Sequence, residues 1–117
     1  MRAEAEKAGG DEGDLRPAPF PPDLAERTAD YLRVVAEPTR IGLLAALNEG
    51  EANVQELADR IGASHQRTSK HLAVLRAAGM VARRRTGPEA RYSLVDWTGW
   101  WVIEQVSRAL APHLETD

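Results

Sequence analysis

The most constraining feature of the sequence is the segment 54–75, whose pattern predicts two short helices joined by a glycine turn. Asn53 is a suitable N-cap for a first helix over 54–61, and Glu56 three residues later completes a capping box. Gly62 can adopt the left-handed conformation that ends a helix and redirects the chain. Two short helices connected in this way are typical of a helix-turn-helix.

The second helix of this pair is predicted to begin after Ser64, which is a favourable N-cap residue. Thr68, Leu72 and Leu75 recur at helical spacing and indicate its buried face. The outward positions near its start carry groups that can hydrogen-bond to base edges or phosphates, and none of them is acidic. These candidate DNA-contact residues are His65, Gln66, Arg67, Ser69 and Lys70.

A β-hairpin is predicted directly after the second helix. Gly79 is typical of the residue that follows a helix end, and Met80 begins a run of strand-forming residues. Residues 86–90 form the predicted turn, and the returning strand covers 91–95. A hairpin in this position is the wing of a winged helix-turn-helix, and we expect its arginines beside the DNA backbone or the minor groove. These arginines are Arg83, Arg84, Arg85 and Arg91.

The distribution of charge matters more than the net charge of −3. Residues 64–91 hold seven Lys/Arg against one acid, a local charge of +6, whereas residues 1–30 hold eight acids against four bases. Salt limits the reach of each charge to about 10 Å, so an acidic body does not prevent a basic face from binding phosphates. The charge pattern therefore favours the same segment for nucleic-acid binding.

Two further helices flank this region, and a tail precedes it. Residues 1–22 are charged, rich in Gly and Pro and poor in large apolar side chains, so we expect a disordered acidic N-terminal tail. Residues 23–117 are expected to form one domain. Apolar spacing predicts a first helix over 23–35 and a last helix, capped by Asp96, that runs to about Leu114.

Further pieces of the chain stand in register with the helix pair. EPTRIGLLAAL covers residues 37–47, KHLAVLRAAGMV covers residues 70–81, and the wing follows. Over roughly residues 29–96, these pieces together resemble the ArsR family of small bacterial repressors. The family motif Ser-x-His-Leu-x-x-Leu-x-x-Ala-Gly is matched by Ser69, His71, Leu72, Leu75, Ala78 and Gly79.

The resemblance implies a mostly α fold with a small β-hairpin, a winged helix-turn-helix that dimerises through its N- and C-terminal helices. It also implies a homodimeric repressor that binds an inverted-repeat operator in double-stranded DNA, with half-sites about one DNA turn (~34–36 Å) apart. One small domain has little room to bury both flanking helices and three tryptophans, which favours the same interface. The candidate interface residues are Leu24, Tyr31, Leu32, Trp97, Trp100, Trp101, Ile103 and Leu110.

Many proteins of this family release DNA when a metal ion binds, but the ligand residues that the resemblance would carry over are missing here. The chain has no cysteine, which removes the thiolate sites. Another family ligand set begins with Asp-x-His, and this chain keeps Asp96 but has Thr98 in place of the His. The later positions of that set fall on Ala109 and Pro112. We therefore expect neither a metal site nor a cofactor.

The tryptophans Trp97, Trp100 and Trp101 allow two interpretations. They form the core of the dimer interface, where tryptophan is enriched, or they wall a pocket for an unidentified small-molecule effector. The sequence leaves both interpretations open.

Other functional classes find little support in the residues. No apolar run is long enough to cross a bilayer, and no signal peptide is recognisable, so we expect a cytoplasmic protein without membrane contact. No catalytic triad or glycine-rich phosphate loop is present, which argues against an enzyme. The remaining alternative is a winged-helix protein-interaction module with little specific DNA binding.

Overall fold

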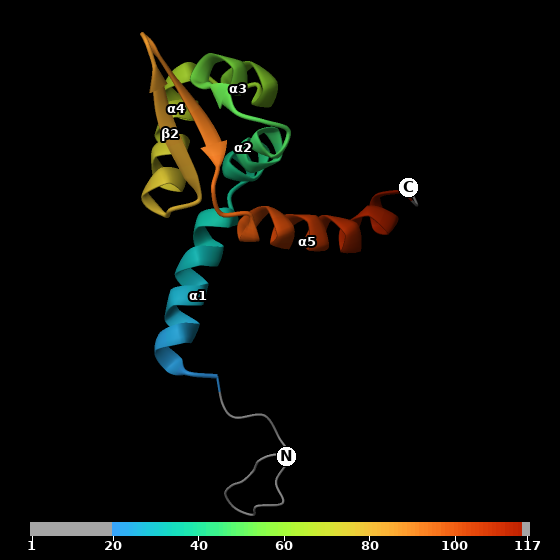
Figure 1. Cartoon of the computed structure of the whole chain (residues 1–117). Helices are drawn as coiled ribbons and strands as arrows, with labels where there is room; N and C mark the ends of the chain where they lie inside the picture. The colour runs from blue at the N-terminus through green and yellow to red at the C-terminus, as the bar shows by residue number, and fades with distance from the viewer. Residues whose placement is uncertain (1–19, 116–117) are drawn as a thin grey trace, which may run out of the picture.

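The computed structural model describes residues 20–115 of the chain, with side-chain surroundings as far as residue 112. The predicted acidic tail lies almost entirely outside the described residues and stays a prediction. A helical body carries a small sheet on one side, and two helices extend away from it in different directions (Figure 1). The elements are α1 (Pro22–Val35), α2 (Pro38–Asn48), β1 (Ala52–Asn53), α3 (Val54–Ile61), α4 (His65–Ala77), β2 (Val81–Thr86), β3 (Glu89–Leu94) and α5 (Thr98–Glu115).

The helix-turn-helix is formed by α3 and α4, and its predicted caps are confirmed. The Asn53 side chain accepts a hydrogen bond from the backbone N–H of Glu56 at 2.8 Å, and the Glu56 carboxylate accepts one from the Asn53 N–H at 2.9 Å. Gly62 ends α3 in the left-handed conformation, with φ of 69°. Ser64 Oγ accepts a hydrogen bond from Arg67 N at 3.0 Å and so caps α4.

The core lies between α2, α3, α4 and the sheet. Thr68, Leu72 and Leu75 are fully buried, as their spacing predicted. Burying one large aliphatic side chain contributes about 1.5–3 kcal/mol, so these contacts hold α4 firmly against the body. The largest fully buried side chains are Leu43, Leu44, Leu47, Leu57, Leu72, Leu75, Met80 and Thr68.

The sheet has three strands in the order β1-β3-β2, one more strand than the sequence predicted. The additional strand β1 has two residues, which is too short to show an alternating pattern. It is antiparallel to β3 and pairs Ala52 with Tyr92.

The predicted limits of the hairpin are wrong by one or two residues at each strand end. Strand pairing continues to Thr86 and Glu89, because Gly87 adopts a φ of 67° and permits a tighter turn than the five residues predicted. Met80 precedes β2, and Val95 lies beyond β3. The Val95 N–H donates to the Met80 carbonyl at 3.1 Å, outside the ladder.

The helices α1 and α5 meet where each joins the body (Figure 1). Gly99 is buried there, and a Cβ at this position would lie 3.4 Å from both the Tyr31 hydroxyl and Val35 Cγ2. The Tyr31 hydroxyl donates a hydrogen bond to Asp96 Oδ2 at 2.9 Å. Asp96 Oδ1 also accepts from Thr98 N at 3.0 Å, so Asp96 caps α5 as predicted. A single residue therefore links the start of α5 to α1.

Candidate nucleic-acid interface

The five candidates on α4 share the outward half of the helix. His65, Gln66, Arg67 and Lys70 are exposed, and Ser69 is half-buried. Because α4 contains no acidic residue, this surface is not electrostatically opposed to phosphate. The helix therefore presents a polar, basic surface opposite its buried face.

Arg67 also approaches α2, since its Nη2 donates to Thr39 Oγ1 at 3.3 Å. The two residues border an open cleft of about 800 Å³ between α2 and the α3–α4 turn. None of the three tryptophans lines this cleft. The structure therefore shows a cleft in a different place from the effector pocket that the sequence left open.

His71 joins the inner part of α4 to the junction of α1 and α2. Arg40 Nη1 donates to His71 Nδ1 at 3.1 Å, and Arg40 Nε donates to the Val34 carbonyl at 2.7 Å. Glu37 Oε1 lies 3.9 Å from the same His71 nitrogen. The backbone N–H of Arg40 is the main reason that the pKa of Glu37 is lowered. His71 therefore contacts structural partners and does not share the outward surface of α4.

The wing arginines lie on two different faces of the hairpin. Residues directly opposite each other share a face, and neighbours along a strand alternate. Arg83 pairs with Tyr92 and Arg85 pairs with Ala90, so these two arginines share one face with the buried Tyr92 ring. Arg84 and Arg91 are paired with each other on the opposite face. The sequence prediction treated these four residues as one group, but the register divides them.

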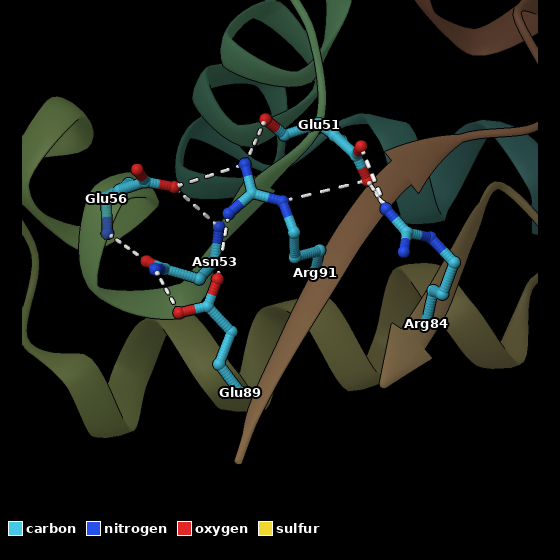
Figure 2. Close-up of polar contacts among 6 residues, drawn as sticks. All are labelled: Glu51, Asn53, Glu56, Arg84, Glu89 and Arg91. Carbon is cyan, nitrogen blue, oxygen red and sulfur yellow. Dashed lines mark hydrogen bonds and ion pairs between the residues drawn. The ribbon is translucent and has the colours of Figure 1, made fainter. Parts of the chain in front are cut away.

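Arg84 and Arg91 belong to a group of ion pairs with three glutamates (Figure 2). Arg84 Nη2 donates to both carboxylate oxygens of Glu51, at 2.8 and 2.9 Å. Arg91 Nη1 donates to Glu89 Oε2 at 2.9 Å, and Arg91 Nη2 donates to the Glu51 carbonyl at 3.2 Å. Arg91 also lies 3.8 Å from the carboxylates of Glu51 and Glu56. We call the following six residues the wing network: Glu51, Asn53, Glu56, Arg84, Glu89 and Arg91.

The wing network stabilises the charged form of Arg91. The pKa of Arg91 is raised, first by its hydrogen bond to Glu89 and then by the negative charges of Glu56 and Glu51.

Sequence reasoning missed Glu51, because it lies 33 residues from Arg84 and 40 residues from Arg91. No local pattern connects residues so far apart in the chain.

The eight candidate interface residues divide into an inner and an outer group. Tyr31, Trp100 and Ile103 are partly buried and pack against the core of the chain itself. Trp97 and Trp101 have 52% and 60% of their surface exposed, which is high for large apolar side chains. The other exposed members are Leu24, Leu32 and Leu110.

The part of the chain that the structure describes contains neither a cluster of metal ligands nor a membrane-spanning helix. Within residues 20–112, no group of three or more His, Asp or Glu side chains is placed to hold a metal ion. No helix in this part of the chain has the length and apolar character to span a membrane.

Comparisons with known proteins agree on one family. Residues 37–83 match the model described as "Bacterial regulatory protein, arsR family". The transcriptional regulator NmtR of Mycobacterium tuberculosis is 39% identical over 88 residues, which cover 74% of this chain and 73% of NmtR. The chain belongs to the arsR family. This is a family of regulatory proteins and not of enzymes, as the sequence indicated.

A second relative, the transcriptional repressor SmtB of Mycobacterium tuberculosis, is 38% identical over 80 residues. These residues cover 68% of this chain and 59% of SmtB, so the chain spans about three fifths of that relative. The fold matches a homodimeric winged helix-turn-helix DNA-binding domain from Mycobacterium bovis, with a TM-score of 0.68 and 25% identity. That match covers 81% of this chain and 88% of the other, and it confirms the predicted winged helix-turn-helix.

Proposed function

We propose that this arsR-family chain is a sequence-specific DNA-binding transcriptional regulator that acts as a homodimeric repressor at an inverted-repeat operator in the cytoplasm. The observation that carries this proposal is the outward surface of α4, which is exposed, polar and free of acidic residues. A helix with such a surface can enter the major groove and hydrogen-bond to base edges. The proposed contacts on α4 are His65, Gln66, Arg67, Ser69 and Lys70.

The proposal of a dimer has two supports. The neighbour from Mycobacterium bovis is itself homodimeric. The exposed apolar side chains include Leu32 on α1, Trp97 directly before α5, and Trp101 and Leu110 on α5, and an interface with a second copy would remove them from water. A two-fold axis would place the two α4 helices on half-sites about one DNA turn (~34–36 Å) apart.

We further propose that the regulator does not sense metals through cysteine and histidine ligands. The chain has no cysteine, and Thr98 stands where the family motif has its histidine. A small-molecule effector is the alternative signal, and the exposed Trp97 and Trp101 would report its binding by a saturable change in fluorescence.

The first experiment is to capture genomic DNA fragments with the purified protein and to footprint the best site at two salt concentrations. We expect protection of an inverted repeat at nanomolar protein concentration, with strong salt dependence because phosphate contacts release counterions. Weak binding without sequence preference would refute the proposal and favour a protein-interaction module.

A matched pair of variants links the result to α4. Lys70→Glu reverses an exposed charge on the proposed DNA surface, and Arg108→Glu makes the same change on α5, where 74% of the side chain is exposed. We expect Lys70→Glu to abolish operator protection and Arg108→Glu to retain it. Sedimentation of both variants checks that they have the same oligomeric state.

A further inference from the structure

The two faces of the wing differ in charge. Arg83 and Arg85 lie on the face of the hairpin that includes Tyr92, and neither has an acidic ion-pair partner within residues 20–112. On the other face, the guanidinium groups of Arg84 and Arg91 meet the carboxylates of Glu51, Glu56 and Glu89, a net charge of −1. Only the first face is positively charged, so it attracts phosphate more strongly.

The wing network also connects the hairpin to the helix-turn-helix. Glu51 precedes β1, and Asn53 and Glu56 form the capping box of α3. The Asn53 side-chain amide donates to Glu89 on β3 at 3.3 Å, and Glu51 bonds to Arg84 on β2 (Figure 2). Both strands of the wing are thus tied to the residues that begin α3.

The pairing of Arg84 with Arg91 needs this counter-charge. Like charges directly opposite each other on two strands repel, and Glu51 contacts both guanidinium groups. If Arg84 moved to a phosphate, it would have to leave a carboxylate that it contacts through both oxygens. The abandoned carboxylate would then lie close to the DNA backbone and repel it.

We propose that Arg84 and Arg91 are positioning residues, which brace the wing against the start of α3 through Glu51, and that Arg83 and Arg85 are the wing residues that contact phosphates. This division rests on the proposed function, and it refines the sequence prediction that all four arginines contact DNA. Glu51 thereby strengthens DNA binding although it carries the same sign of charge as DNA.

The test compares a charge-balanced variant with a phosphate-contact variant. Glu51→Gln/Arg84→Gln removes the brace without changing the net charge, and Arg83→Gln/Arg85→Gln removes the proposed contacts. The affinity of each for the captured operator duplex is measured by fluorescence anisotropy over a series of NaCl concentrations. Thermal unfolding confirms that each variant is folded, and hydroxyl-radical footprinting reports whether the wing still protects the flanks of the site.

For Arg83→Gln/Arg85→Gln we expect the slope of log affinity against log salt to become shallower by about 1.8, and affinity to fall about 30-fold at ~0.15 M salt. For Glu51→Gln/Arg84→Gln we expect an unchanged slope, a loss of affinity of about two- to fivefold, and loss of flank protection. A slope shallower by about 0.9 in this second variant would identify Arg84 as a phosphate contact and overturn the proposal. Unchanged affinity would also overturn it.

Glu51→Gln alone is a second test of the proposal, and it does not require the removal of an arginine. If Glu51 is a brace, its loss weakens DNA binding with an unchanged slope. If Glu51 only competes with DNA for Arg84, its loss strengthens binding and steepens the slope, which contradicts the proposal. Wild-type protein that binds no duplex would refute the proposed function itself, an outcome distinct from either result.

Discussion

The hydrogen bond from Tyr31 to Asp96 joins α1 to α5, and Tyr31→Phe removes it without creating a cavity. The donor and acceptor atoms are 2.9 Å apart, and both residues are half-buried. A hydrogen bond to a charged group contributes about 1.5–3 kcal/mol, and partial access of water to Asp96 lowers this. We therefore expect Tyr31→Phe to reduce the free energy of unfolding by about 1–1.5 kcal/mol at neutral pH.

The same contact makes the free energy of unfolding depend on pH. The pKa of Asp96 is lowered, first by the backbone N–H of Thr98 and also by the Tyr31 hydroxyl, so its stabilisation is present above the usual pKa of 3.8 and is lost as the pH falls. Burial and the contact with Asp96 raise the pKa of Tyr31 from 10.0 to about 12. This second stabilisation is present below pH 10.0 and is lost as the pH rises toward about 12. The difference in the free energy of unfolding between wild type and Tyr31→Phe should therefore become smaller at both acidic and alkaline pH.

The assay is urea unfolding at a fixed protein concentration, followed by tryptophan fluorescence from acidic to alkaline pH. Tyr92→Phe is the control, because no hydrogen bond joins the Tyr92 hydroxyl to any residue in the range 20–112. Equal destabilisation by the two substitutions would refute the reasoning. The reasoning would also be refuted if the difference in the free energy of unfolding between wild type and Tyr31→Phe did not change with pH.

Three further predictions concern DNA recognition, folding and assembly. Arg67→Ala should cost about 1–3 kcal/mol of operator binding and relax the base preference at one position in a selection from randomised duplexes; unchanged preference would make Arg67 a phosphate anchor. Asn53→Ala removes the capping box of α3 and should lower the free energy of unfolding by about 1 kcal/mol, measured by urea denaturation, whereas Gln55→Ala leaves the cap intact and should have less effect. Trp101→Ala removes a side chain that is 60% exposed in the single chain, so it should shift sedimentation toward monomer; an unchanged equilibrium would place Trp101 outside the interface.

The parts of this fold that the sequence predicted correctly depend on residues close together in the chain. The capping box of α3 joins Asn53 to Glu56, and the cap of α4 joins Ser64 to Arg67, each over three residues. The glycine at position 62 must be left-handed because the chain turns there. Such local preferences made the helix-turn-helix and its outward residues predictable.

The hairpin shows where local reasoning became less accurate. Its existence was predicted, but its ends were displaced and β1 was missed. Strand ends depend on how far a ladder continues after the turn, and a strand of two residues exists only because β3 lies beside it. The face on which each arginine lies follows from the register, and a shift of one residue would reverse it.

The sequence by itself determined the helix-turn-helix, the basic surface of α4 and the membership of the arsR family, because each depends on residue types at short, fixed spacings. Only the tertiary structure decided which charges meet. Glu51 reaches Arg84 across 33 residues, Arg40 reaches His71 across 31, and Tyr31 reaches Asp96 across 65. Contacts over such distances arise only after the helices pack and the strands align, since packing and register, and not local preference, bring these side chains within hydrogen-bonding distance.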